Sequence, residues 1–141
     1  MQDMSAAEVR EFILTGTRTG KLATVKENGR PHVVPIWFVL DGDDLLFNTW
    51  HTSVKARNME RNGRVAICVD NENPPYDFVM LEGVATLIDD LAEVKKWATV
   101  IGGRYMGADQ AEAFGERNGV AGELLVRVKI DKMVAKKEMS A

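Results

Sequence analysis

Residues 47–64 read Phe-Asn-Thr-Trp-His-Thr-Ser-Val-Lys-Ala-Arg-Asn-Met-Glu-Arg-Asn-Gly-Arg, and this stretch joins a predicted strand to a predicted helix. The apolar residues from Leu45 to Phe47 predict the end of a buried strand. Ser53 is a favourable N-cap, so a short helix is expected to begin directly after it. Within the stretch a single acid, Glu60, stands against four cations: Lys55, Arg57, Arg61 and Arg64.

This basic stretch belongs to a chain whose net charge is −3 at pH 7. A helix N-terminus offers free backbone N–H groups, and a cap hydroxyl with nearby cations adds further donors for an anion. The stretch therefore indicates an anion site around Ser53. A solvated surface helix would carry the same charges, and from charge alone both interpretations stand.

Length and composition indicate a single domain over residues 1–141, with 45% hydrophobic residues to form its core. A pI near 5.4 argues against a general nucleic-acid binder. A lone cysteine, Cys68, excludes an internal disulfide and fits a reducing compartment. No apolar run approaches the length of a membrane span, and no export signal is visible. We therefore expect a cytoplasmic protein with no nucleic-acid or membrane partner.

A β-hairpin is predicted before the basic stretch. Residues 20–26 alternate as a strand, Asn28-Gly29 is a strong hairpin turn, and residues 31–40 form a nearly all-apolar return strand. Such a run is buried on both faces or lines a pocket on one of them. Pro35 cannot donate to a ladder, which leaves one side of the strand unpaired. That gap suits a planar ligand, and a simple bulge at a barrel corner would explain it equally well.

The remaining elements complete a mainly β fold with flanking helices. A capping box at Ser5 predicts a helix that ends at Gly16, and Asp89-Asp90 predict a helix that Gly102-Gly103 breaks. A more polar helix is expected over residues 108–117. Further strands are expected over residues 45–49, 65–70 with Cys68 in the core, 77–88 with a bend at Gly83, 123–130, and around Val134. A count of about six or seven strands at this spacing predicts a barrel.

No protein-borne catalyst is evident in the sequence. His32 and His51 have no second ligand at metal-binding spacing, so we expect no metal site. Nucleophile-elbow, Walker and Gly-x-Gly-x-x-Gly motifs do not occur. Chemistry in this protein would therefore come from a bound cofactor, and we assign no catalytic side chain.

An ordered set of motifs carries a family resemblance. The Asn28-Gly29 hairpin leads into the apolar strand, and the motifs that follow are Phe47-x-Thr49, Ser53-x-Lys55-x-Arg57-x-Met59 and Glu82-Gly83. In this order the chain resembles, over residues 20–130, the split β-barrel flavin- and deazaflavin-binding proteins related to pyridoxamine 5′-phosphate oxidase. Residues 104–107 and the strand at 123–127 are similar to the branch of that family that uses the deazaflavin coenzyme F420.

The resemblance implies a homodimeric split barrel with the cofactor bound between subunits. Its ring would face the apolar strand at Val34, Pro35, Ile36 and Trp37. Asn48 and Thr49 would touch the ring or the ribityl chain, while Ser53, Lys55 and Arg57 would hold the phosphate. Tyr76 would reach the cofactor of the partner subunit.

On this basis we expect an F420-dependent oxidoreductase that transfers hydride to an electron-poor double bond of a small organic substrate. Arg61 and Arg64 are surplus to a single phosphate and would suit the acidic tail of F420. An FMN-binding oxidase or reductase of the same fold is the first alternative. A non-catalytic cofactor carrier or ligand sensor on the same barrel is the second.

Overall fold

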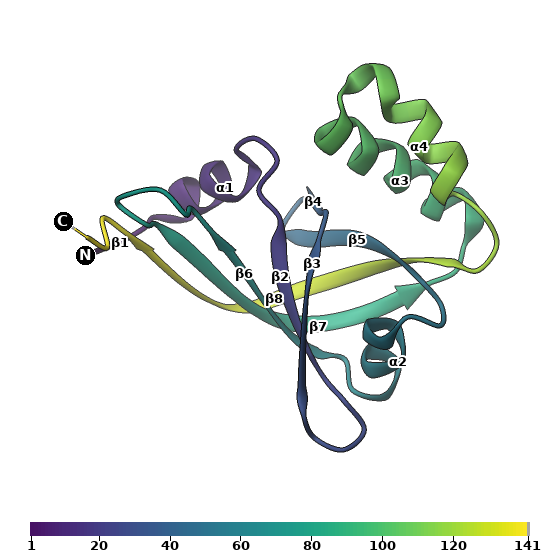
Figure 1. Ribbon diagram of the computed structural model, residues 1–141, viewed down its shortest axis with the longest axis horizontal. Helices are drawn as coiled ribbons and strands as arrows, with labels where there is room; N and C mark the ends of the chain where they lie inside the picture. The colour runs from purple at the N-terminus through teal and green to yellow at the C-terminus, as the bar shows by residue number, and fades with distance from the viewer. Residues whose placement is uncertain (141) are drawn as a thin grey trace.

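A computed structural model describes residues 1–140 of the chain, which form one strongly curved antiparallel sheet with helices around it (Figure 1). The strands are β1 (Gln2–Asp3), β2 (Gly20–Val25), β3 (Pro31–Ile36), β4 (Val39–Asp41), β5 (Asp44–Trp50), β6 (Arg64–Asp70), β7 (Phe78–Ile88) and β8 (Glu123–Lys137). The helices are α1 (Ala6–Leu14), α2 (Val54–Arg61), α3 (Leu91–Met106), the 3₁₀ turn η1 (Ala108–Gln110) and α4 (Ala111–Asn118).

The sheet closes on itself because its two edge strands are neighbours in the chain. The strand order is β3-β2-β6-β7-β8-β5-β4, and only Trp37 and Phe38 lie between β3 at one edge and β4 at the other. No ladder pairs β3 with β4 in the described residues, so the barrel stays open along this line. The predicted mainly β fold with flanking helices, a split β-barrel, is therefore confirmed, with the short β1 added beside β8.

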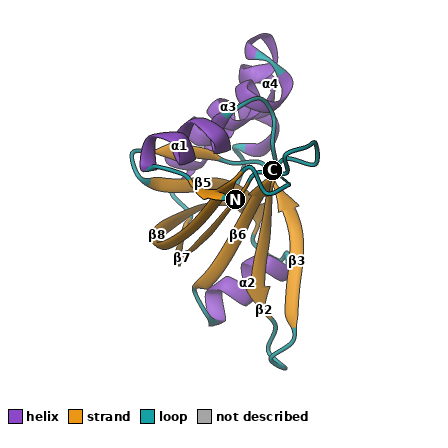
Figure 2. Cartoon of the chain, turned by 90° about the vertical axis from the view of Figure 1, so that its left-hand side faces the viewer, coloured by secondary structure: helices purple, strands orange, loops and turns teal. Residues whose placement is uncertain are grey.

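The main core lies inside the curved sheet, because alternate residues of each strand point inward. In β6, for example, Val65, Ile67 and Val69 are buried while the residues between them are partly exposed. We call Trp37 and Phe38, the two residues between β3 and β4, the β3–β4 joint. The largest side chains that are fully buried come from this joint and from several strands: Leu22, Phe38, Leu45, Leu46, Phe47, Ile67 and Leu125. A second buried cluster, formed by Val39, Leu46 and Leu125 with Val94 and Ile101 of α3, lies between the sheet and that helix. Figure 2 shows the curled sheet with α3 and α4 on one side and α2 on the other.

Helix α3 anchors the joint between β3 and β4. The Arg104 guanidinium donates to the carbonyl oxygens of Phe38 at 2.6 Å, Ile13 at 2.7 Å and Gly16 at 3.2 Å. The Tyr105 hydroxyl donates to the Arg18 carbonyl at 2.8 Å and accepts from the Phe38 N–H at 3.1 Å. Two consecutive side chains thus tie the joint to the segment between α1 and β2.

Three cap predictions are confirmed. Ser5 caps α1 in a complete capping box with Glu8, Ser53 caps α2, and Asp90 caps α3. The bend at Gly83 is also confirmed, since the β7–β8 register shifts between Glu82 and Gly83. A Cβ at Gly83 would lie 2.4 Å from the Lys129 carbonyl oxygen, so only glycine fits the close approach of β8.

Two strand predictions were wrong. The run 31–40 is not one strand, because the chain leaves β3 after Ile36 and enters β4 at Val39 on the opposite edge of the sheet. The two final strands expected over 123–130 and around Val134 are one long strand, β8, which has a bulge with the extra residue Asp131 where β7 passes from Glu82 to Gly83. A bulge lets one strand continue where the sequence pattern breaks.

Two further predictions failed for reasons of packing. Gly102-Gly103 does not break α3, which continues to Met106. A Cβ on Gly102 would lie 2.3 Å from the Phe114 Cβ, so the glycine allows α4 to pack closely on α3. Cys68 is not in the core either, because it faces the outer side of β6 and is only partly buried. Among residues 1–140, no helix has the length and apolar character needed to cross a membrane.

The Tyr105 anchor makes a prediction about stability. Tyr105→Phe removes the hydroxyl and leaves the Phe38 N–H without its partner, so it should lower the free energy of unfolding by about 1–3 kcal/mol. Tyr76→Phe is the matched control, since Tyr76 is exposed. Urea unfolding of both variants beside the parent protein measures the difference. Equal destabilisation of the two variants would contradict the anchoring role.

Candidate cofactor site

A small hollow opens beside the β3–β4 joint and collects most of the residues predicted to face a ring. Its volume is about 230 Å³, and its walls come from β3, the joint, β5, the start of β8, α3 and α4. The lining residues are Pro35, Ile36, Trp37, Asn48, Ile101, Asn118 and Glu123. We call it the ring hollow.

Stacking fixes the position of Trp37 in the ring hollow. Its indole lies parallel to the Tyr105 ring, with centroids 5.0 Å apart and an interplanar angle of 4°. The Phe114 ring of α4 tilts against it at 5.9 Å. The indole still leaves 38% of its surface exposed, which makes it an available apolar wall for a planar ligand.

The N-terminus of α2 is ordered by two hydroxyl groups. The Ser53 Oγ accepts from the Ala56 N–H at 3.1 Å and shares a hydrogen bond with the Thr49 Oγ1 at 2.7 Å. Thr49 is only 3% exposed, so its hydroxyl positions the cap rather than facing the ring hollow. This local structure follows from the sequence, because Ser is a preferred cap and β5 ends just before it.

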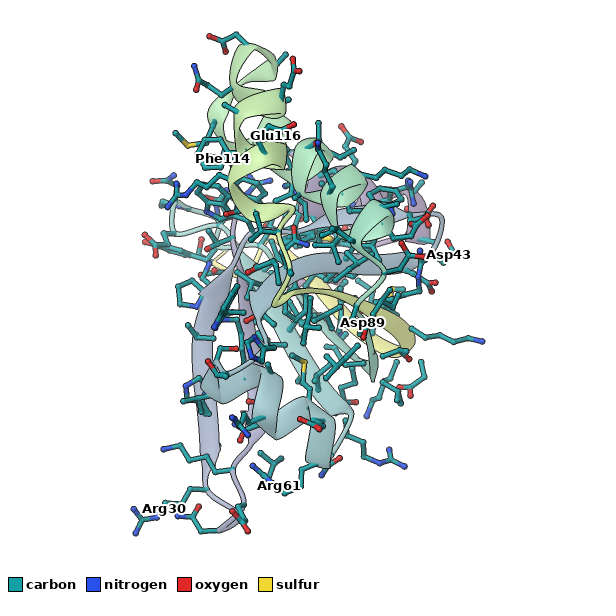
Figure 3. All side chains as sticks on the ribbon, turned by 90° about the vertical axis from the view of Figure 1, so that its right-hand side faces the viewer. Arg30, Asp43, Arg61, Asp89, Phe114 and Glu116 are labelled. Atoms are coloured by element: carbon teal, nitrogen blue, oxygen red, sulfur yellow. The ribbon has the colours of Figure 1, made fainter. Side chains whose placement is uncertain are left out.

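A second, larger hollow lies between α2 and the β2–β3 hairpin. It has a volume of about 500 Å³ and is lined by Lys26, Glu27, Asn28, Thr52, Val54, Arg57, Asn58 and Arg61. Figure 3 shows Arg61 beside the hairpin whose tip carries Arg30. Arg61 donates to Asn58 Oδ1 at 3.2 Å and to the Val25 carbonyl at 3.4 Å. We call this cavity the basic hollow, since three cations and one acid line it.

Lys55 lies in different surroundings from Arg57. Residues two apart on a helix point to different sides, and Lys55 is half-buried near Glu123 whereas Arg57 is exposed in the basic hollow. Burial lowers the pKa of Lys55, and the Glu123 charge raises it in part. Burial likewise raises the pKa of Glu123, and Lys55 opposes that rise.

The predicted site residues thus fall into three groups. Pro35, Ile36, Trp37 and Asn48 line the ring hollow; Thr49 and Ser53 form the cap; Arg57 and Arg61 line the basic hollow. Val34 lies on β3 opposite Leu22 and is not among the lining residues of the ring hollow. Lys55 stands apart beside Glu123.

Tyr76 lies far from α2 within the chain. It is in the loop after β6, whereas α2 immediately precedes β6. Seven strand residues separate the two ends, a length of about 20 Å. Tyr76 is 48% exposed and is not a lining residue of either hollow.

Nine lining residues were not predicted as site residues: Lys26, Glu27, Asn28, Thr52, Val54 and Asn58 of the basic hollow, and Ile101, Asn118 and Glu123 of the ring hollow. Lys26 enters the basic hollow from the hairpin, and Ile101, Asn118 and Glu123 enter the ring hollow from α3, α4 and β8. Their places depend on which strands pair and on how α4 packs, and neither is visible in local sequence. Only the Gly122-Glu123 step, an acid directly after a turn glycine at a strand start, hints at a special position.

The donor groups present fit a flavin-type cofactor better than a metal. Residues 1–140 contain no group of three His, Cys, Asp or Glu side chains placed to hold a metal ion. In the same range, His32 Nδ1 is the buried side-chain polar atom that lacks a hydrogen-bond partner. It lies on β3, opposite Thr24, whose hydroxyl accepts from Asn58 of α2 at 3.0 Å. A hollow with Trp37 as one wall, together with a capped, cation-bearing helix, suits a ring joined to a phosphate.

This fold and arrangement define a split-barrel protein with a site for a planar, anionic cofactor. The model of the pyridoxamine 5′-phosphate oxidase family matches residues 5–136. The chain therefore belongs to the pyridoxamine 5′-phosphate oxidase family, which includes oxidoreductases. This confirms the resemblance stated from the motifs.

Solved structures agree with this assignment. A conserved hypothetical protein, Rv2991 from Mycobacterium tuberculosis, is similar at a TM-score of 0.86 and 24% identity, covering 96% of this chain and 86% of that chain. An F420 reductase is similar at a TM-score of 0.69 and 26% identity, covering 87% and 94%. An FAD-binding protein from Mesorhizobium loti is similar at a TM-score of 0.70 and 22% identity, covering 95% of both chains. These likenesses show that the chain shares the fold of these proteins.

The proximity of Lys55 and Glu123 makes a prediction about titration. Glu123→Gln removes the negative charge that raises the pKa of Lys55, so that pKa should fall further below its ordinary value. The measurement is an NMR titration of ¹³C-dimethylated lysines. Glu60→Gln is the control, because Glu60 is exposed on the same helix and should leave Lys55 unchanged. A Lys55 titration identical in parent and Glu123→Gln would show that the two charges do not interact.

Proposed function

We propose that this single-domain protein is an F420-dependent oxidoreductase of the cytoplasm. The observation that carries the proposal is the arrangement of the two hollows: the ring hollow includes Glu123, which lies near Lys55 of α2, and the basic hollow is lined by Val54, Arg57, Asn58 and Arg61 of the same helix. F420 has a ring, a phosphate and an acidic tail in that order. The F420 reductase of the same fold supports the choice.

In this proposal the ring lies against the β3–β4 joint. Pro35, Ile36 and Trp37 form the apolar wall, Val34 supports it from the preceding position of β3, and Asn48 supplies an amide. Reduced deazaflavin, when bound, supplies a hydride to an electron-poor double bond of a small organic substrate. The part of the chain is to hold the ring, exclude water from one face and orient the substrate on the other.

The phosphate is held at the start of α2. Ser53 and the free N–H groups of the helix supply hydrogen bonds, Thr49 fixes the cap, and Lys55 and Arg57 supply positive charge from two sides. The acidic tail continues past Arg57 to Arg61 and Lys26 in the basic hollow. FMN ends at its phosphate and would leave the basic hollow unused, so this hollow favours F420 over the FMN alternative.

The protein is proposed to act as a homodimer with the cofactor between subunits. The outer face of the sheet carries a row of paired residues from neighbouring strands: Pro35, Lys21, Cys68, Met80 and Val134. This row is largely apolar, and Val33 beside it is 63% exposed. A second copy on this face would bury these side chains and bring the Tyr76 loop of one subunit toward the cofactor of the other.

Variants of the basic residues test the proposed cofactor. Losing a charge-assisted hydrogen bond costs roughly 1.5–3 kcal/mol, so Lys55→Ala and Arg57→Ala should each weaken F420 binding by about ten- to a hundredfold. Arg61→Ala should weaken F420 with a long glutamate tail more than F420 with a short one. Fluorescence titration of each variant with both cofactors, at low and high salt, gives the affinities.

Arg64→Ala is the matched control for these variants. Arg64 is an exposed arginine just after α2 and lines neither hollow, so its loss should leave the affinity unchanged. If both Lys55→Ala and Arg57→Ala bind F420 as the parent protein does, α2 does not bind the cofactor and is only a solvated surface helix. Tight binding of FMN, with no binding of F420, would establish the FMN alternative instead.

The proposed dimer makes its own prediction. Light scattering at micromolar concentration should give twice the chain mass of 15.7 kDa, because stable dimers of this kind bury upwards of about 2,000 Å². Met80→Lys places a charge in the middle of the apolar row and should yield monomers, whereas Lys129→Glu, at an exposed position of β8, should not. A monomeric parent protein would contradict the shared site.

A further inference from the structure

Glu123 has a place in the ring hollow that the proposed function does not yet use. It is the first residue of β8, and its position is fixed by pairing opposite Trp50 of β5. The Asn48 amide donates to the neighbouring Leu124 carbonyl at 3.4 Å, which joins the same two strands at the hollow. Among the lining residues, all in the described part of the chain, Glu123 alone is titratable.

The charges around Glu123 come from several elements. From α2, Lys55 lies near enough to act on its pKa, yet no ion pair within 4.0 Å joins them in residues 1–140. From the turn after β5, the His51 Nδ1 lies 2.9 Å from the Gly122 carbonyl oxygen. Arg117 of α4 stacks on the Phe114 ring, and Arg104 of α3 is bound to backbone carbonyls. Glu123 therefore has a cation nearby but is not held by one.

We propose that Glu123 is the proton donor of the hydride-transfer reaction. This inference rests on the proposed function, since it needs a ring and a substrate in the ring hollow. Glu123 is half-buried and lines the same hollow as Trp37, so its carboxyl group is available to a substrate bound in that hollow beside the ring. A donor must reach the reacting atom before any other property matters.

The step balances with the groups named. The substrate double bond accepts a hydride, with its two electrons, at one carbon, which leaves a carbanion at the other. That carbanion takes the proton from the Glu123 carboxyl group: a C–H bond forms and the O–H bond breaks. The carboxylate that remains is stabilised by the Lys55 ammonium group and regains a proton from solvent.

Burial supports the role because it raises the pKa of Glu123, so more of the acid form persists toward neutral pH. A donor must be protonated to act. The rate of the proton-dependent step should therefore be high below the pKa of Glu123 and fall as pH rises through it. A glutamine at this position cannot donate and should lose that pH dependence.

The test compares the parent protein with Glu123→Gln, Glu123→Asp and the exposed control Glu112→Gln. The readouts are F420 affinity, the pH profile of single-turnover reduction of cyclohex-2-en-1-one by the reduced complex, and a ¹³C carboxyl NMR titration of the free protein. We expect Glu123→Gln to bind F420 normally, to react about a hundredfold more slowly and to lose the pH-dependent fall. Glu123→Asp should keep part of the parent rate, and its rate should again fall as pH rises.

The NMR titration identifies the Glu123 signal by its absence from Glu123→Gln and should give a pKa above the ordinary value. Normal F420 binding with a parent-like rate and pH profile in Glu123→Gln would overturn the donor role and leave the proposed function standing. A parent protein that binds F420 but does not reduce the enone would also overturn the donor role. If the parent protein binds no F420, the proposed function fails and the donor role fails with it.

Discussion

The Arg104 guanidinium, bound to three backbone carbonyls, is the interaction on which the barrel and its site depend. It joins the end of α1, the turn after it and the β3–β4 joint to the last turn of α3. No carboxylate pairs with it in residues 1–140, and its charge is stabilised by the carbonyl dipoles and by the Phe38 and Tyr105 rings, whose centroids lie 4.7 and 4.8 Å from its Cζ. Burial lowers the pKa of Arg104, but a guanidinium stays protonated in proteins, and the anchor holds at every working pH.

This anchor determines where the functional residues lie. The chain leaves one edge of the sheet at Ile36 and must reach the other edge by Val39, so the two joint residues have little freedom. Phe38 turns fully inward, and Trp37 turns outward onto Tyr105. One face of the joint thus completes the core while the other forms a wall of the ring hollow, and the split in the barrel is what leaves space for a ring.

The helix caps and the first hairpin could be predicted from the sequence, because each depends on residues close together in the chain. Ser5, Ser53 and Asp90 cap helices because their side chains reach backbone N–H groups within the same turn. Asn28-Gly29 forms its hairpin for an equally local reason. These features predicted where the basic helix and the apolar strand lie in the sequence. Those two segments supply several lining residues of the ring hollow and of the basic hollow.

The sequence predictions that were wrong concern residues whose structure depends on contacts between distant segments of the chain. Gly102 looks like a helix breaker in sequence but serves the close packing of Phe114, twelve residues later. Residues 31–40 look like one strand because both strands they form are apolar, and only sheet closure divides them. For Glu123 the sequence offered only its position directly after Gly122, because the surroundings of Glu123 come from β5, α2 and α4, whose meeting point local sequence does not encode.

The central claim is that one cofactor spans the ring hollow, the α2 cap and the basic hollow. A crystal structure of the protein with F420 tests it most directly. The account predicts the ring against Trp37 and Pro35, the phosphate at Ser53 and the α2 N-terminus, and the glutamate tail along Arg57 and Arg61. Density for the ring away from the β3–β4 joint, or for the phosphate away from α2, would contradict it.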